Sequence, residues 1–248
     1  MSTELTGSTA LITGSTSGIG RATASALADR GAHVVISGRD AKRGERAAER
    51  IRAVGGEADF IAADLRDEAS ARSLARQAVE TAGPIDILVN NAGIFPSSST
   101  AATTESQFDD VYAVNVKAPF FLVAELGPQM AQRGKGAIVN ISSIAAEKGF
   151  PGKSLYGSSK ASLVLLTKAW ATEFGPSGVR VNAVNPGPVR TEGTDSAGED
   201  LKQFYDGTPS GRAGTPEEVA AAVAFLASDD AGYIQGAVLP VDGGGSAV

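Results

Sequence analysis

The chain has 248 residues, no cysteine and a single histidine, His33, and these counts exclude disulfides, cysteine nucleophiles and His-rich metal sites, so we expect no metal. The net charge of −6 comes from acidic and basic residues that are mixed along the chain, which argues against nucleic acid or an anionic membrane as a partner. No stretch has the pattern of a signal peptide or a membrane span, and we expect a cytoplasmic location by default.

Short β-rich runs alternate with Ala-rich helical patterns along the whole chain, which indicates βαβ units around a parallel sheet. The expected strands are Thr9–Thr13, Val34–Ser37, Asp59–Ala63, Ile87–Asn90, Ala137–Ser142, Arg180–Val184 and Ala237–Val241. The expected helices are Ile19–Arg30, Ala41–Val54, Glu68–Thr81, Glu105–Arg133, Leu155–Phe174 and Pro216–Ala227, the fourth bent or interrupted at Pro119. We therefore predict an α/β fold: one doubly wound Rossmann-type domain over residues 1–248, with a seven-stranded parallel sheet and helices on both faces.

The segment Pro186–Gly214 is rich in Gly, Ser, Thr and Asp and shows no regular pattern. It is too long for a routine connection in a compact domain, and segments of this kind are often lids or binding loops. We expect it to be a substrate loop.

The first strand ends in Thr13-Gly14-Ser15-Thr16-Ser17-Gly18-Ile19-Gly20 and leads directly into a helix. Glycines at such a turn let a dinucleotide pyrophosphate approach the backbone amides at the positive end of the helix. The spacing differs from the general Gly-x-Gly-x-x-Gly fingerprint, and glycines also serve strand-to-helix turns for structural reasons alone. Nucleotide binding and a purely structural turn both fit this motif.

The second strand ends in Ser37-Gly38-Arg39-Asp40. An NAD site usually places a carboxylate here for the ribose 2′-hydroxyl, whereas a 2′-phosphate needs a cation. Arg39 at the tip of the strand therefore favours NADP(H). The alternative is that Arg39 is a solvated loop charge and that Asp40 caps the following helix.

Two further groups of polar residues stand at positions suited to chemistry. Ser142 and Ser143 end the fifth strand, at the sheet edge where open α/β sheets bind ligands. Tyr156 and Lys160 lie four residues apart in a helical pattern, so a nearby ammonium would lower the pKa of the phenol. Each group has an ordinary structural explanation when it is taken alone.

The order of the motifs resembles the short-chain dehydrogenase/reductase family over nearly the whole chain. The shared features are Thr-Gly-x3-Gly-Ile-Gly, Asn90-Asn91-Ala92-Gly93, a helical Asn115, a serine thirteen residues before Tyr-x3-Lys, Asn185-Pro186-Gly187 and Val241-Asp242-Gly243-Gly244. The resemblance implies a hydride transfer between NADP(H) and a carbonyl or secondary alcohol.

The same resemblance assigns roles residue by residue. Tyr156 would be the acid/base, Lys160 would lower its pKa and hold the nicotinamide ribose, Ser143 would orient the carbonyl, and Asn115 would join a proton relay through water. The implied cofactor contacts are Gly14, Ser15, Ser17, Gly18, Ile19, Gly20, Ser37, Arg39, Asp64, Leu65, Asn91, Ala92, Gly93, Tyr156, Lys160, Pro186, Gly187, Val189 and Thr191. Ser17 departs from members that prefer NADP, which often have a basic residue there, so Arg39 carries that preference here.

Two alternatives differ from this interpretation: an NAD(H)-dependent dehydrogenase of the same family, and a dinucleotide-binding regulator without catalytic activity. A dehydratase or epimerase on the same scaffold would show tightly bound cofactor and no net redox turnover. Phe150, Leu155 and Phe204 suggest an apolar pocket and an uncharged small-molecule substrate, whose identity the sequence does not give. Members of the family are commonly homotetramers, and we expect a homotetramer or homodimer.

Overall fold

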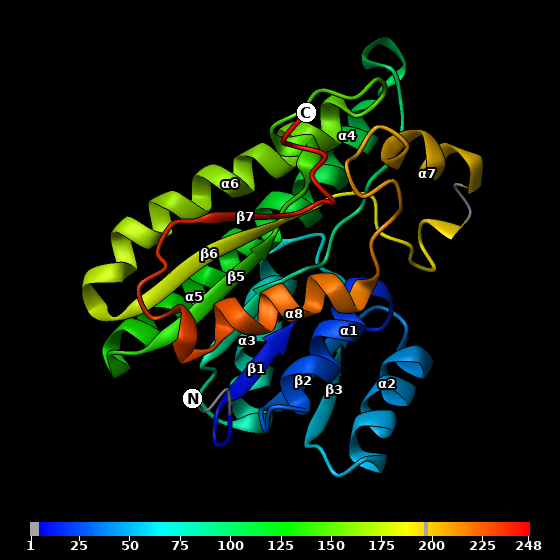
Figure 1. The fold of residues 1–248 in the computed structure, drawn as a ribbon. Coiled ribbons are helices and arrows are strands. Elements are labelled where there is room, and N and C mark those ends of the chain that lie inside the picture. The colour runs from blue at the N-terminus through cyan, green and yellow to red at the C-terminus, as the bar shows by residue number, and fades with distance from the viewer. Residues whose placement is uncertain (1–4, 196–197) are drawn as a thin grey trace.

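The computed structural model describes residues 5–195 and 198–248, and its centre is a seven-stranded parallel sheet. The strand order is β3-β2-β1-β4-β5-β6-β7 (Figure 1). The strands are β1 (Thr9–Ile12), β2 (His33–Gly38), β3 (Ala58–Ala62), β4 (Ile87–Asn90), β5 (Gly136–Ile141), β6 (Val179–Pro186) and β7 (Val238–Val241). All seven predicted strands are present, and each boundary lies within two residues of the prediction.

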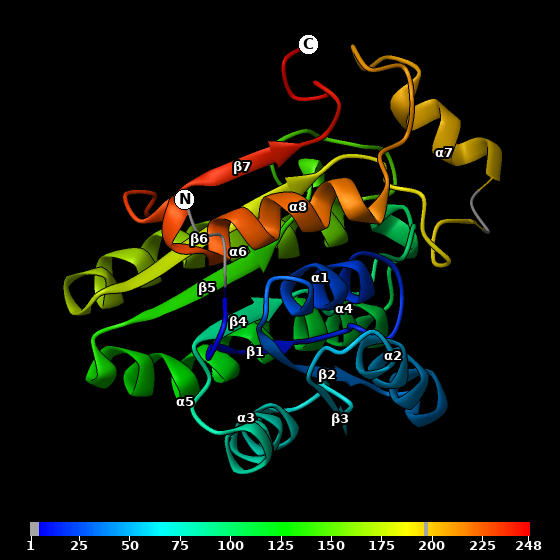
Figure 2. The ribbon, with the colours of Figure 1, turned by 60° about the horizontal axis from the view of Figure 1, so that its bottom comes forward.

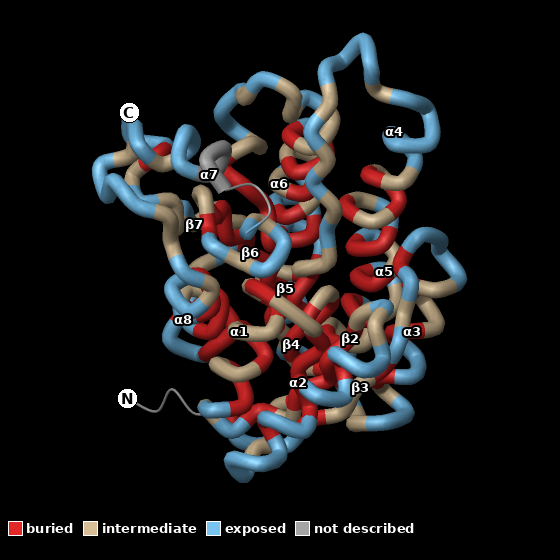
Figure 3. Tube along the Cα trace, turned by 90° about the vertical axis from the view of Figure 1, so that its right-hand side faces the viewer, coloured by how far each residue is buried: buried red, intermediate tan, exposed pale blue. Residues whose placement is uncertain are grey.

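Helices cover both faces of the sheet, as predicted (Figure 2). On one face the buried side chains of α1 (Gly18–Ala28), α2 (Ala41–Ala53) and α8 (Pro216–Ala227) join one apolar core. On the other face α3 (Glu68–Ala82), α5 (Ala118–Arg133) and α6 (Ser154–Phe174) form a second core. Buried residues are concentrated in the strands and along the helix sides that face them (Figure 3).

The strand order reverses direction between β1 and β4, because the chain builds outward from β1 to β3 and then crosses back to β4. In open parallel sheets, ligands bind at the carboxyl ends of the strands next to such a reversal. The glycine turn after β1 and the Asn-Asn-Ala-Gly segment after β4 both lie at this point. The topology therefore brings two of the sequence motifs together.

The helix predicted over Glu105–Arg133 consists of two helices separated by a π-helical turn. Helix α4 (Glu105–Tyr112) ends at the turn Ala113–Lys117, and α5 begins at Ala118. Pro119 stands in the first turn of α5 and has no amide hydrogen for the carbonyl of Asn115, four residues earlier. The predicted interruption is real, and it takes the form of a wider turn around Asn115.

The segment predicted as a substrate loop contains regular structure. Helix α7 (Gly198–Tyr205) lies beyond the carboxyl ends of the strands (Figure 1). An isolated parallel bridge between Val189 and Gly214 joins the start of the segment to its end. Two hydrogen bonds reinforce this bridge, from the Gly214 amide to Pro188 O at 2.9 Å and from the Arg190 amide to Gly214 O at 3.0 Å. Within the described residues, no helix has the length and apolar character needed to cross a membrane.

Candidate active site

A cavity of about 1090 Å³ opens at the carboxyl ends of the strands and collects the predicted motifs. Of the predicted site residues, every one except Ser15 and Asn115 lines this cavity. Its volume slightly exceeds the range of about 300–1000 Å³ that is usual for small-molecule sites, as expected if a dinucleotide and a substrate share the space. In the part of the chain that the structure describes, no three acidic or histidine side chains converge as metal ligands would.

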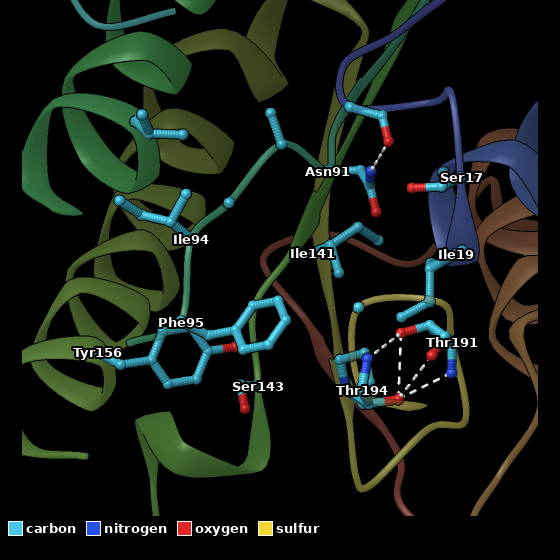
Figure 4. Close-up of a pocket in the computed structure, with 18 of the residues that line it drawn as sticks. Ser17, Ile19, Asn91, Ile94, Phe95, Ile141, Ser143, Tyr156, Thr191 and Thr194 are labelled. Carbon is cyan, nitrogen blue, oxygen red and sulfur yellow. Dashed lines mark hydrogen bonds between the residues drawn. The ribbon is translucent and has the colours of Figure 1, made fainter. Parts of the chain in front are cut away.

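The glycine turn after β1 needs glycine for two physical reasons. Gly14 and Gly18 have φ angles of +62° and +52°, in the left-handed region. A Cβ on Gly14 would also lie 2.8 Å from the Cα of Ala92. Asn91 fixes this contact, because its side-chain amide donates to Thr13 O at 2.8 Å and to Gly14 O at 3.0 Å (Figure 4).

An acidic side chain that the sequence interpretation missed lies on the amino end of α1. The Gly18 amide donates to Glu192 Oε2 at 3.0 Å, and Arg21 Nη2 is 2.7 Å from Glu192 Oε1. No side chain of the N-cap residue, Ser17, satisfies the free amides of this helix. The amino end of α1 therefore holds a carboxylate at the place where the motif predicts a phosphate. The unpaired amides and the positive end of the helix dipole favour an anion there.

The far end of the cavity, beyond β2, has a basic character. Arg39 makes no ion pair or hydrogen bond with any described residue, whereas Arg43 Nε donates to Asp40 Oδ2 at 3.0 Å. Asp40 also accepts the Arg43 amide as the N-cap of α2, and this bond is the main cause of the lowered pKa of its carboxyl. The side-chain oxygen of Ser37 is buried without a partner. Arg39 and Ser37 thus remain available to a ligand.

Ser15, a predicted cofactor contact, does not line the cavity, and its hydroxyl is engaged inside the protein. Ser15 is fully buried, and its Oγ donates to Ile12 O at 2.6 Å and accepts the Ser37 amide at 3.0 Å. These two bonds connect the glycine turn to the end of β2. Its role is therefore to hold the turn, and the sequence motif alone does not distinguish that role from ligand contact.

Ser143 and Tyr156 lie on the opposite side of the cavity from the glycine turn (Figure 4), and Lys160 also lines the cavity. The Ser143 side chain lies close enough to Tyr156 to affect the pKa of its phenol, and Ser143 Oγ accepts the Ala145 amide at 3.1 Å. Lys160 Nζ donates to Ile141 O at 2.8 Å and lies 5.9 Å from the centroid of the Tyr156 ring. Ser142 Oγ donates to Lys160 O at 3.0 Å, which fixes the end of β5 to α6.

The pKa of Tyr156 moves in the direction opposite to the one the sequence predicts. Burial raises the pKa of this phenol, and the hydrogen bond with Ser143 lowers it by less. Burial also lowers the pKa of Lys160 to about 8. Desolvation is thus the main cause of the pKa shift of both groups.

Asn115 lies behind the cavity wall rather than in it. Its side chain accepts the Ile94 amide at 2.9 Å, donates to Ile94 O at 2.9 Å and donates to Ser159 Oγ at 3.0 Å. The residue thereby joins the segment after β4 to α6, beside Gly93 and Lys160. Every polar atom of the side chain has a partner within the protein.

The segment after β6 packs closely against Asp242, which follows β7, and against Gly18 of the glycine turn. A Cβ on Gly187 would lie 2.7 Å from the Cα of Asp242, and Thr191 approaches Gly18. Thr194 Oγ1 accepts the Thr191 amide at 2.8 Å and donates to Val189 O at 2.8 Å (Figure 4). This hydrogen-bonded turn closes the cavity on the side opposite Tyr156.

An apolar compartment adjoins Tyr156, and a lysine that the sequence interpretation missed lies in it. Phe95 packs edge-on to Tyr156 at 6.4 Å between ring centroids, and Phe150 packs edge-on to Phe204 at 5.6 Å. Phe95, Phe150 and Phe204 line the cavity, as does Lys153. Of the residues predicted for an apolar pocket, Phe150 and Phe204 line the cavity and Leu155 does not, and Lys153 adds a cation to the wall.

The residues of the cavity fit a nicotinamide dinucleotide. The amino end of α1 already binds an oxygen anion, that of Glu192, and a buried hydroxyl and an unpaired guanidinium lie at the far end. The hydroxyls of Ser143 and Tyr156 lie at the other end, so the donors are spread along the whole cavity.

Comparisons with known proteins agree with this geometry. A family model described as enoyl-(acyl carrier protein) reductase matches residues 14–246. An uncharacterized oxidoreductase of Thermotoga maritima is 42% identical, with 98% of each chain aligned. The 3-oxoacyl-(acyl-carrier-protein) reductase FabG of Staphylococcus aureus is 38% identical over 95% of this chain and 96% of its own length.

Solved structures are similar over the full length. A short chain dehydrogenase/reductase family protein is 51% identical with a TM-score of 0.92, and the match covers 99% of this chain and 100% of the other. A blue fluorescent protein from a metagenomic library, in complex with NADPH, is 35% identical with a TM-score of 0.93, over 98% and 99% of the two chains.

Proposed function

Because the chain belongs to the short-chain dehydrogenase/reductase family and is an NAD(P)-dependent oxidoreductase acting on CH–OH groups, we propose that it transfers hydride between NADP(H) and a carbonyl or secondary alcohol, with Tyr156 as the acid/base. The observation that carries the proposal is that the side chains of Ser143 and Tyr156 line the same cavity as the glycine turn, on the side opposite to it (Figure 4). Two hydroxyls at one point offer two hydrogen bonds to a single substrate oxygen.

The reduced nicotinamide supplies the hydride to the substrate carbon. Tyr156 donates its phenolic proton to the substrate oxygen as negative charge develops there, and Ser143 donates a hydrogen bond to the same oxygen. Because burial raises the pKa of Tyr156, the phenol holds its proton at neutral pH. That state is the one that carbonyl reduction requires.

Lys160 and Asn115 support this step. The Lys160 ammonium, fixed by Ile141 O, stabilises the phenolate that remains after proton transfer. Asn115 keeps the segment after β4 aligned with α6 through Ile94 and Ser159. The side chain of Asn115 is fully bonded within the protein. A proton relay through Asn115 would therefore use its backbone carbonyl, which has no amide donor four residues later because residue 119 is proline.

The catalytic assignment is tested with Tyr156→Phe. We expect turnover to fall by a factor of about 100 to 10,000, the usual contribution of a positioned acid, while NADPH affinity stays within about two-fold. Lys168→Met, an exposed change on the same helix, is the control for a general effect on α6. Near-normal turnover by Tyr156→Phe on carbonyl compounds that the wild type reduces would refute the assignment.

The preference for NADP(H) is supported by the unpaired Arg39, the orphan Ser37 hydroxyl and the engagement of Asp40 with Arg43. A carboxylate that already accepts two hydrogen bonds from Arg43 is a poorer acceptor for the 2′-hydroxyl of NAD(H). An unpaired guanidinium is a strong donor to a 2′-phosphate. The similar structure that was solved in complex with NADPH is consistent with this choice.

Calorimetric titration with NADPH and with NADH tests the cofactor. A charge-assisted hydrogen bond is worth about 1.5–3 kcal/mol, so Arg39→Ala should weaken NADPH about ten- to hundred-fold and NADH very little. Arg46→Ala on the exposed side of α2 is the control for the loss of one charge. Equal or tighter binding of NADH would favour the NAD-dependent alternative, and binding of neither would favour a non-catalytic role.

A further inference from the structure

Lys153 is a half-buried cation in the wall of the substrate compartment. Its Nζ donates to Phe95 O at 3.3 Å, and this carbonyl is the only hydrogen-bond partner that the described residues give it. No described carboxylate lies within 4.0 Å, although Asp110 of α4 also lines the cavity. An ammonium has three donors and this exposed bond uses one, so the other two are available to solvent or to an anion in the cavity.

The position of Lys153 in its helix is also unfavourable. It is the N-cap residue of α6, a helix of 21 residues, and provides no side-chain cap. The first turn contains no acidic residue. A cation at the positive end of a helix dipole and a set of uncapped amides both cost stability. An anion bound beside Lys153 would relieve both costs.

The apolar residues around Lys153 strengthen its effect. Phe95 packs on Tyr156, and Phe150 with Phe204 forms the neighbouring wall. Such walls reduce the local dielectric and make an ion pair stronger than at an open surface. The half-buried ammonium keeps part of its contact with solvent, and beside these walls an anionic ligand would add an ion pair that a neutral ligand does not.

We propose that Lys153 binds an anionic group of the substrate, so that the enzyme acts on an oxo acid and the corresponding hydroxy acid. This inference rests on the proposed function, and it replaces the uncharged substrate expected from the sequence. Reduction consumes one hydride from NADPH and one proton from Tyr156, and the carboxylate remains unchanged on Lys153. The hydroxy acid and NADP are the products.

The spacing along α6 limits the size of the substrate. Lys153 and Tyr156 are three residues apart at the start of one helix, and residues at that spacing have Cβ atoms about 5–6 Å apart. A carboxylate on Lys153 and a carbonyl at Tyr156 therefore belong to one small molecule, with a few carbon atoms between them. A long neutral thioester would leave Lys153 without its partner.

The test compares matched pairs of substrates with NADPH as the donor. The probes are 3-oxobutanoate, 4-oxopentanoate and 5-oxohexanoate, each with its methyl ester, and the N-acetylcysteamine thioester of 3-oxobutanoate. We expect at least one acid to have a kcat/KM well above that of its ester. Lys153→Met should lower that acid-to-ester ratio about ten- to hundred-fold, mainly through the KM of the acid, and Lys153→Arg should keep most of it.

Lys135→Met controls for the change in net charge, because Lys135 is exposed and precedes β5, at the opposite end of the strand from Ser143. Thermal unfolding of each variant reports whether α6 is intact. Esters or the thioester reduced better than every acid, with ratios unaffected by Lys153→Met, would overturn the inference and leave the proposed function standing. Failure to reduce any carbonyl compound, with NADPH bound, would overturn both.

Discussion

Replacing Lys160 with methionine tests how much stability the protein loses by burying the charged form of this lysine. Lys160 is 4% exposed, and burial lowers its pKa from the ordinary 10.5 to about 8. This difference corresponds to about 3 kcal/mol of stability that is lost while the buried amine is charged. The lowered pKa means that between about pH 8 and 10.5 the unfolded chain binds more protons than the folded one, so stability rises with pH in this window.

The expected result is a widening difference between wild type and Lys160→Met. Below pH 8 the full cost is present in the wild type only. As the pH increases from 7 to 9.5, the free energy of unfolding of the wild type should gain about 2 kcal/mol relative to the variant. The measurement is urea unfolding at several pH values and at one protein concentration, because assembly would also affect stability.

Lys168→Met is the matched control, since Lys168 lies on the same helix and is exposed. Its stability should follow that of the wild type at every pH. Parallel curves for the wild type and Lys160→Met would mean that Lys160 is not destabilised by burial. In that case the stabilisation of a Tyr156 phenolate by a poorly solvated ammonium would lose its physical basis.

Three other changes follow from contacts described above. Glu192→Gln removes a negative charge from beside the Gly18 amide. NADPH should therefore bind about two- to ten-fold tighter by calorimetry, which is the scale of an exposed ion pair. Weaker binding would show that Glu192 holds the segment after β6 closed around the cofactor. Because burial raises the pKa of Tyr156, the initial rate of alcohol oxidation should climb with pH through the alkaline range. The rate of carbonyl reduction should stay level from pH 6 to 7, below the pKa of about 8 at which Lys160 loses its charge, and a reduction rate that falls within this range would contradict the assignment. Phe120 on α5 is 43% exposed and Leu165 on α6 is 68% exposed. If these helices form a subunit interface, Leu165→Glu should reduce the mass of the protein found by light scattering. An unchanged mass would exclude this face as a subunit interface.

Much of the fold is predictable because hydrophobic periodicity and turn residues act locally. All seven strands and the boundaries of Pro216–Ala227 follow from such patterns. The break at Pro119 follows from its missing amide, but the π-helical form of the turn depends on how Asn115 bonds to Ile94 and Ser159. Those partners are distant in sequence, so local pattern does not reveal them.

Site residues that belong to a family motif could be predicted from the sequence. Charged residues and pKa shifts that depend on packing were missed. The motif brings Ser143, Tyr156 and Lys160 together, yet the pKa direction of Tyr156 depends on burial that spacing alone does not give. Ser15 belongs to the same motif as its neighbours but faces inward. Lys153 and Glu192 lie outside any motif, and only the cap position of Lys153, a cation before a long helix, was a signal in the sequence.

The bridge between Val189 and Gly214 has a consequence for how new specificities arise in this protein. It fixes the two ends of residues 190–213 side by side, so β6 and α8 do not depend on the length of the chain between them. Doubling such a loop costs only about 0.6 kcal/mol in closure entropy. The part of this segment that follows Thr194, with Phe204 in the outer wall of the pocket, can therefore be exchanged. Variants with shortened, lengthened or grafted chain there should keep Thr191 and the reaction while they change the substrate.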